Sequence, residues 1–410
     1  MPPASSPTRS QLFLAVLACA GALLVAHVLG RFMFTPLLPH FIADGMLTLR
    51  QGAQLATWNY VGYLVGALLA LRWYRPATLR RALTLALVAN ALLTAAQLAT
   101  ADADVLLVLR TLNGVSNGIV FVQAPALVLE WLSQHGKAQL SGLTYVGVSI
   151  GLVISSGLSE WPADWLQGPA RWWPAAALAL PVALWSAAYL RRIDLPAPAP
   201  SVAGGHPGAL FDRASIPLFL AYAGGGLGYI LPMTFLPVLA VEQLEPGDQL
   251  IRSVWFWASL ASVPTLWLWN GLGARWGDRR TLILNYAVQL LGMLGPLLWP
   301  GALGIWLCAL LVGSTSLGTV LLSQRLARML QPHQGPRLAA ALIALWGLAQ
   351  LTGPWLAGHW LRFGGSLTST WWIGAGALAW GLAWSMAVPE PAEWHRRRAV
   401  GTAGTSVSGG

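Results

Sequence analysis

Arg31 lies deep inside a long apolar run, 12–42, four residues after His27. A guanidinium keeps its proton at physiological pH, so Arg31 carries a full charge into its surroundings. Against lipid that charge costs about 2.5–3.5 kcal/mol on insertion scales, so such a residue belongs beside a polar cavity or a partner. His27 shares its helix face and titrates near neutral pH, which suits proton transfer. The pair favours a site that binds a negatively charged group.

Other polar and aromatic side chains lie inside further apolar runs, many at helical spacing. Arg110 is followed at one and two turns by Asn113 and Asn117, which places the three on one side of a helix. The candidate binding residues are Arg31, Arg110, His27, Asn59, Tyr60, Tyr63, Asn113, Asn117, Tyr222, Tyr229, Thr234, Trp346 and Gln350.

Each candidate also has a structural interpretation. Arg110 is near enough to the end of its run to extend its guanidinium to the membrane surface. Asn113 and Asn117 would also suit hydrogen bonds to a neighbouring helix. Pro36 frees a backbone carbonyl in the first run, and Arg31 would then serve to bond carbonyls of its own broken helix. The sequence leaves these alternatives open.

Acidic residues are absent from the middle of every apolar run. A deep carboxylate proton relay is therefore not visible, and Arg31 lacks an acidic partner unless the fold brings Asp44 or Asp102 close. An unpaired cationic site favours an anionic ligand, whose carboxylate replaces the missing counter-charge. Zinc-type His/Glu spacing, a Walker loop and a Gly-x-Ser-x-Gly elbow are also absent, so we expect no metal, no cofactor and no enzyme activity.

The composition is that of a membrane protein. Hydrophobic residues make up 56% of the 410 and charged residues only 9%, against roughly 25% in soluble domains. The runs are continuous and near the ~20 residues that a spanning helix needs, whereas a strand barrel would show alternating segments of about ten residues. We predict an all-α integral membrane protein of twelve transmembrane helices. The predicted spans are 12–42, 52–73, 79–100, 104–130, 138–158, 171–190, 214–241, 250–273, 280–299, 302–329, 337–360 and 368–388.

The chain has a net charge of +10, and its basic residues lie mostly in short loops between the apolar runs. This placement is typical of residues that set the orientation of membrane helices, and it does not indicate nucleic-acid binding. Most of the 24 basic residues fall in alternate loops, so the positive-inside rule places both termini and the central linker in the cytoplasm. We expect a multi-pass inner-membrane protein. The predicted parts are a cytoplasmic N-terminus 1–11, a six-helix bundle 12–190, a linker 191–213, a second six-helix bundle 214–388 and a largely disordered cytoplasmic tail 389–410.

The two halves repeat one another. The stretch from Gly30 to Pro39 aligns with the stretch from Gly228 to Pro237, with Gly and Pro nine residues apart in both. Paired arginines and a glycine-rich span recur at nearly the same offset. Parallel repeats of this kind predict two pseudo-symmetric six-helix bundles with a ligand site between them near the membrane midplane.

These residues resemble the major facilitator superfamily, and the YbfB/YjiJ-type branch in particular. The likeness is carried by Gly30-Arg31-Phe32 with Thr35-Pro36-Leu37-Leu38-Pro39 in the first span, and by the run from Trp58 to Gly66 in the second. It covers residues from about 12 to 390. The resemblance implies the major facilitator fold, and it implies that spans one, four, seven and ten line the cavity.

A loop after the eighth span is similar to the superfamily's signature loop, which latches the two halves on the cytoplasmic side in related transporters. This chain departs from the pattern at Ala274, where the family usually has an acid, so the resemblance implies a weakened latch. The latch residues that the resemblance implies are Arg275, Gly277, Asp278, Arg279 and Arg280.

We therefore expect a secondary active transporter of a small organic anion, with Arg31 and Arg110 attracting its carboxylate and His27 suited to proton coupling. One alternative is a proton-coupled exporter of hydrophobic or drug-like compounds, which the missing Gly-Pro pair of the fifth span and the missing deep acid oppose. A second alternative is a non-transporting membrane sensor, which the lack of a large extra domain opposes. We expect a monomer whose partners are the lipid bilayer and a small molecule, with no nucleic acid.

Overall fold

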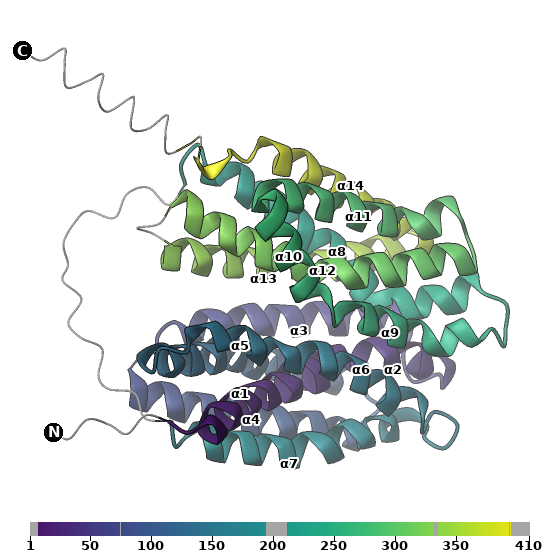
Figure 1. Ribbon diagram of the computed structural model, residues 1–410. Helices are drawn as coiled ribbons and strands as arrows, with labels where there is room; N and C mark the ends of the chain where they lie inside the picture. Colours follow the sequence, from purple (N-terminus) through teal and green to yellow (C-terminus); the bar gives the residue numbers. More distant parts are fainter. Residues whose placement is uncertain (1–6, 74, 194–210, 332–334, 393, 395–410) are drawn as a thin grey trace, which may run out of the picture.

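The computed structural model describes residues 7–73, 75–193, 211–331, 335–392 and 394. In these residues the chain forms helices and contains no strand. Most of the predicted linker, 194–210, and of the predicted tail, 395–410, lie outside the described residues, as do residues 1–6. The helices make twelve passes, six in each of two bundles that lie one above the other in Figure 1.

The first bundle begins with a pass built from three consecutive segments, and its fifth and sixth passes each begin with a 3₁₀ turn. Its elements are α1 (Arg9–Leu23), the π-helical η1 (Leu24–Phe32), α2 (Phe34–Ala43), α3 (Leu49–Ala70), α4 (Pro76–Ala96) with η2 (Gln97–Ala99), α5 (Ala103–Gln134), η3 (Ala138–Tyr145) with α6 (Val146–Glu160), and η4 (Gly168–Trp172) with α7 (Trp173–Leu190).

The second bundle also has six passes, and its first pass is a single continuous helix. The eighth pass of the chain is interrupted at Val263 and Pro264, because Pro264 has no N–H to continue the helix hydrogen bonding. The elements of the second bundle are α8 (Ser215–Gln243), α9 (Gln249–Ser262), α10 (Thr265–Trp276), α11 (Asp278–Leu298), α12 (Ala302–Leu330), α13 (Gly335–Arg362) and α14 (Leu367–Ala387).

Nine helical segments of the described residues are long and apolar enough to cross a membrane on those criteria alone. The other three passes are α3, the α9–α10 pair and α14, which run alongside them in the bundles. We call the side where α1 begins and α14 ends the terminal side, and the other side the opposite side. The predicted twelve-helix, two-bundle fold is confirmed.

Glycines allow α3 and α5 to pack backbone against backbone. A Cβ atom at Gly62 would overlap the carbonyl oxygen of Thr111, and one at Gly114 would overlap the carbonyl oxygen of Asn59. Close approach through small residues is the usual way in which membrane helices associate. This contact fixes α5 against α3, and both helices carry candidate site residues.

The bundles meet along three helix pairs, α2 with α8, α3 with α13, and α6 with α9. In Figure 1 they approach one another most closely on the opposite side, around α2, α6 and α9, and less closely towards the chain termini. The interface between the bundles therefore contains the middle of the first pass, where Arg31 lies.

An ion pair joins the end of the first pass to the start of the sixth on the opposite side. The Arg171 guanidinium donates from Nε and Nη2 to the two carboxylate oxygens of Asp44, at 2.6 and 2.8 Å. The Gly168 N–H donates to the same carboxylate at 2.7 Å. The hydrogen bonds from Arg171, assisted by the Gly168 amide and by the Arg171 charge, hold the pKa of Asp44 below its ordinary value.

Replacing Gly114 by leucine should prevent α3 and α5 from reaching their native contact. We expect a loss of at least about 3 kcal/mol in stability, because the obstacle is backbone that cannot rotate away. Gly376→Ala is the matched control: it lies on α14 with open space around its Cβ position, so it should leave stability unchanged or slightly improved. Thermal unfolding in detergent measures both. Equal melting temperatures for the two variants would contradict the packing argument.

The Asp44 ion pair predicts a pH dependence of stability. Because its folded-state pKa lies below the unfolded value of about 3.9, the pair stabilises the fold above that pH and its contribution disappears as pH falls through the folded pKa. The difference in melting temperature between the native chain and Asp44→Asn should be constant from about pH 8 to pH 5 and shrink below about pH 4. Asp104→Asn, an exposed acid in the first turn of α5, should show no such difference.

Candidate functional site

The first pass is widened to a π-helix at η1, and Arg110 bonds the carbonyls exposed there. Nη1 of Arg110 donates to the carbonyl oxygen of Gly30 at 3.2 Å, and Nη2 donates to that of Arg31 at 3.4 Å. Pro36, five residues after Arg31, has no N–H to offer that carbonyl. The guanidinium also lies over the ring of Phe34 at 4.3 Å. Arg110 is thus buried in the first bundle and does not extend to the membrane surface.

Arg31 points away from these carbonyls, towards the second bundle. Its Nη2 donates to Oε1 of Gln350 on α13 at 2.5 Å. Its guanidinium carbon is 4.2 Å from the ring centre of Tyr60 and 4.7 Å from that of Tyr63, both on α3. Nε and Nη1 have no hydrogen-bond partner among the described residues, although only 2% of Arg31 is exposed. The structural interpretation from the sequence, carbonyl bonding in the broken helix, therefore applies to Arg110 and not to Arg31.

The fold does not bring an acid to Arg31. Asp44 is paired with Arg171, and Asp102 caps α5 by accepting from the backbone N–H groups of Asp104 and Val105. Among the described residues no carboxylate forms an ion pair with Arg31, whose positive charge is balanced only by aromatic faces and an amide oxygen.

The second bundle contributes an aromatic wall behind Gln350. The Nε2 group of Gln350 donates to the hydroxyl of Tyr229. The ring of Tyr229 stacks on Trp346 at 4.9 Å between centres, and Tyr222 lies 4.5 Å from the same indole. These residues come from α8 and α13, and the amide of Gln350 connects them to Arg31.

Two further hydrogen bonds cross between the bundles near Arg31. The hydroxyl of Tyr60 bonds that of Thr234 at 3.0 Å, joining α3 to α8. The hydroxyl of Thr35 donates to the carbonyl oxygen of Met233 at 2.8 Å, joining α2 to α8. The Arg31 cluster therefore lies at a point where the two bundles bond directly.

His27 lies on the other side of the cluster. Its Nδ1 is 3.3 Å from Oδ1 of Asn117, and its ring lies 4.3 Å from that of Phe121. Phe121 also contacts Tyr63 edge to face at 5.9 Å. Phe121 was not among the candidates predicted from the sequence, because an aromatic residue in an apolar helix carries no signal of its own.

A cavity of about 630 Å³ begins at Phe121 and lies between the bundles in the terminal half of the protein. It is lined by the terminal halves of α5 and α12 together with η3, α10 and α13, and its polar wall includes Tyr145, Asn270 and Arg328. Such a volume suits a small-molecule ligand. Phe121 separates this cavity from His27 and Tyr63.

Asn59 and Asn113 face neighbouring helices and not the Arg31 cluster. Asn59 donates to the carbonyl oxygen of Arg110 at 2.8 Å. Asn113 donates to the carbonyl oxygen of Asn90 at 3.2 Å and to the hydroxyl of Thr94 at 3.1 Å, both on α4. The helix-bonding alternative raised for Asn113 and Asn117 describes Asn113, and Asn59 bonds in the same way. Asn90, which lies with Gln97 in the third apolar run, was missed.

The opposite side of the interface is closed by contacts between α6 and α9. The indole N–H of Trp255 donates to the hydroxyl of Ser155 at 2.9 Å. Arg252 lies 3.4 Å from a carboxylate oxygen of Glu160 and 3.5 Å from one of Asp164. Arg252 is half exposed, so this ion pair is worth little by itself. With the buried bond of Trp255 it marks the side on which the bundles touch.

The predicted latch loop is bonded within the second bundle. Gly277, between α10 and α11, has φ of 86°, which favours glycine. The Asp278 carboxylate lies 3.0 Å from Nε of Arg325 on α12, and Arg325 also donates to Asn270. Asp278 is buried, so it is held by its own bundle.

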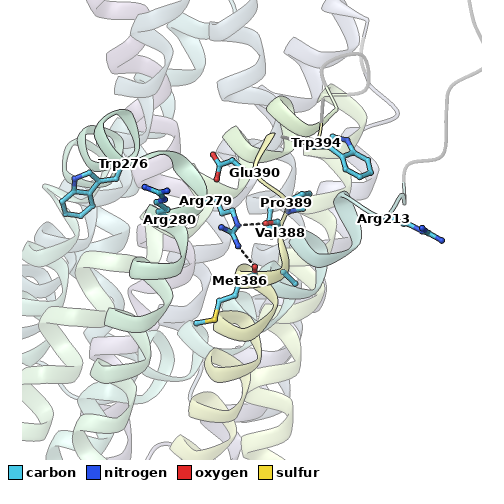
Figure 2. A pocket seen from close by; sticks show the side chains of 10 residues that line it. Arg213, Trp276, Arg279, Arg280, Met386, Val388, Pro389, Glu390 and Trp394 are labelled. Atoms are coloured by element: carbon cyan, nitrogen blue, oxygen red, sulfur yellow. Dashed lines mark hydrogen bonds between the residues drawn. The ribbon is translucent and has the colours of Figure 1, made fainter. Parts of the chain in front are cut away.

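Figure 2 shows the neighbouring arginines of this loop. Arg279 donates at 2.6 Å to each of the carbonyl oxygens of Met386 and Val388 at the end of α14. Arg275 and Arg280 are exposed. The bonds described for Asp278 and Arg279 all lie within the second bundle, so a latch between the halves stays a prediction.

Arg110 and Arg31 should differ in their effect on stability. Arg110→Ala removes the side-chain donor from two buried carbonyls, and we expect a loss of about 1–3 kcal/mol. Arg31→Ala removes a buried guanidinium of which only one nitrogen is hydrogen-bonded, so we expect it to change stability by less than about 1 kcal/mol. Arg110→Lys, which replaces the two bonding nitrogens by one ammonium nitrogen, should fall between the two. Thermal unfolding of the purified variants gives the order, and a larger loss for Arg31→Ala than for Arg110→Ala would contradict these roles.

Several solved structures share this fold at low sequence identity. The nucleoside transporter NupG matches with a TM-score of 0.68 at 12% identity, over 93% of this chain and 99% of its own. The D-xylose-proton symporter matches at 0.71 and 12%, over 94% and 99%. The inward-open xylose transporter XylE from E. coli matches at 0.72 and 14%, over 92% and 97%.

No curated protein matches the chain. A family model does, over residues 23–386, and it is described as that of the uncharacterised MFS-type transporter YbfB. The fold and the matched length agree with the resemblance seen in the sequence. The protein is therefore a multi-pass membrane transporter that belongs to the YbfB-type family of the major facilitator superfamily.

Proposed function

We propose that this protein is a secondary active transporter of a small organic anion, with Arg31 as the residue that binds the anionic group. The observation that carries the proposal is the buried Arg31 guanidinium, which lies between the bundles with two of its three nitrogens unbonded and no acid to pair with among the described residues. A carboxylate ligand would supply both the missing charge and the missing acceptors.

The neighbouring side chains support the same function. Tyr60, Tyr229 and Gln350 surround the guanidinium with hydroxyl and amide groups, which orient a polar ligand. Arg110 has a different role in this proposal, because its guanidinium is occupied by backbone carbonyls. It shapes η1, and Arg31 alone carries the charge that meets the ligand.

The interface between the bundles is bonded on the opposite side and contains a cavity in the terminal half, and this difference supports transport by alternating access. The cavity of about 630 Å³ lies in the terminal half, whereas the bonds that join the bundles lie near Arg31 and on the opposite side. Rocking of segments 12–190 and 214–388 about the Arg31 cluster would open the opposite side and close the cavity. On the positive-inside rule we propose that the cavity and both termini face the cytoplasm, on the inner side of an inner membrane.

His27, one turn before Arg31, is the group near this site whose ordinary pKa is close to neutral, and it is the candidate for proton coupling. It shares a helix face with Arg31 and bonds Asn117 on α5. An anion that carries a negative charge to Arg31 would also stabilise a protonated His27 one turn away. The fold itself also serves proton-coupled transport, since one solved match is a D-xylose-proton symporter.

Uptake of a panel of labelled carboxylates into proteoliposomes tests the proposal. At least one carboxylate should be accumulated by the native protein, and Arg31→Ala should lower its transport by at least about 30-fold, because removing one partner of a buried charge pair costs about 2–5 kcal/mol. Arg31→Lys should retain part of the activity. Arg72→Ala, which removes an exposed charge at the terminal end of α3, is the matched control and should transport normally. Normal transport by Arg31→Ala, or transport of only uncharged solutes, would refute the anion assignment.

A further inference from the structure

A groove of about 410 Å³ lies between α3 and α13, on the outer side of the bundle interface. The two helices run antiparallel across the two bundles, and α13 lies directly beside α3 in Figure 1. Gly358 faces Ala53 at one level, and Gly347 faces Leu64 and Tyr63 at another. This register places the start of α3 beside the end of α13, so the groove runs from the opposite side towards the level of Arg31.

The groove opens to the membrane and not to the cavity in the terminal half. Its walls include Trp58 and Trp355, which are 44% and 47% exposed. Val65 and Leu348, on the same two helices, are also exposed although they are apolar. In a membrane-spanning protein such side chains face lipid, so the groove is a lipid-facing feature.

The lining changes from apolar to polar along the groove. Val61 and Leu351 form its apolar end, next in the chain to Tyr60 and Gln350 of the Arg31 cluster. At the other end are the three polar side chains that could meet a headgroup, namely Gln54, His359 and Arg362.

This polar end carries an unpaired positive charge. Arg362, in the last turn of α13, has no ion pair or hydrogen bond among the described residues. His359 bonds the carbonyl oxygen of Trp355 through Nδ1, which leaves Nε2 for another partner. Arg362 is one of the few basic residues on the opposite side, where most loops carry acids. The positive-inside rule, which accounts for the basic residues of the terminal side, therefore does not account for Arg362.

We propose that this groove binds an anionic phospholipid of the surrounding membrane. The phosphate lies against Arg362, His359 and Gln54, and an acyl chain lies along the apolar part between Trp58 and Trp355. A soluble anion would use only the polar end, and a zwitterionic lipid would bring its own cation beside the guanidinium as well as its phosphate. The occupant that matches both ends is an amphiphile with a negative headgroup.

Because the groove is formed by one helix from each bundle, a bound lipid contacts both bundles at once. Rocking of the bundles changes the distance between α3 and α13, so lipid binding depends on the conformation. The same two helices present Tyr60 and Gln350 on their inner faces. The lipid site is distinct from the Arg31 cluster and does not depend on which solute the protein moves.

Native mass spectrometry of the full-length protein, exchanged into micelles that contain phosphatidylglycerol or phosphatidylcholine, tests the proposal. The native protein should retain phosphatidylglycerol in preference to phosphatidylcholine. Arg362→Ala should weaken phosphatidylglycerol retention by about fivefold, the worth of one arginine at an anionic membrane surface. Arg362→Lys should restore the preference, because an ammonium also binds phosphate.

Two further variants separate the parts of the groove. Leu351→Trp keeps the charge and fills the apolar end, and it should lower retention of both lipids. Arg72→Ala removes one exposed charge at the other end of α3 and should leave retention unchanged. Equal retention by the native protein and Arg362→Ala would overturn the proposal. An equal loss in Arg72→Ala would also overturn it, since it would reveal attraction to surface charge in general.

Discussion

The bond between Arg110 and the widened turn of the first pass governs the geometry around it. Glu or Asp could not take this place, because the turn exposes carbonyl oxygens and needs a donor with more than one N–H group. The guanidinium donates through two nitrogens, to the carbonyls of Gly30 and Arg31, and lies over the ring of Phe34. Once those carbonyls are bonded within the first bundle, the side chain of Arg31 is free to point the other way.

That direction places a second guanidinium at the interface of the two bundles. Arg31 is nearly fully buried but incompletely bonded, which is unfavourable in a structural residue and useful in one that awaits a ligand. Its contacts with Tyr60, Tyr63 and Gln350 come from both bundles. Any rocking of one bundle against the other therefore changes the surroundings of this charge, which links ligand binding to conformation.

The two halves of the sequence repeat have the same arrangement of helices but different side chains at equivalent positions of the candidate site. Tyr229 occupies the place in α8 that aligns with Arg31 in the first pass, and it bonds Gln350 while Arg31 bonds the same amide from the other bundle. One amide thus joins the two pseudo-equivalent positions. The asymmetry puts the cation in the first bundle and the aromatic wall of Tyr222 and Trp346 in the second.

The sequence alone was sufficient for the class, the twelve passes and the two-bundle plan, because long apolar runs and alternating charge follow directly from the thickness and polarity of a membrane. It also identified Arg31, since a charge in an apolar run requires an explanation. The sequence could not show which of the two guanidinium groups, that of Arg31 or that of Arg110, is left without a full set of hydrogen bonds. Both residues lie at a similar depth and differ only in the helix that each one faces. Only the tertiary structure decided that Arg110 bonds backbone, that Asn59 and Asn113 hold helices together, and that Gln350 meets Arg31 across 319 residues of sequence. Periodicity assigns a residue to a face of its helix, whereas the neighbour of that face is set by packing between helices.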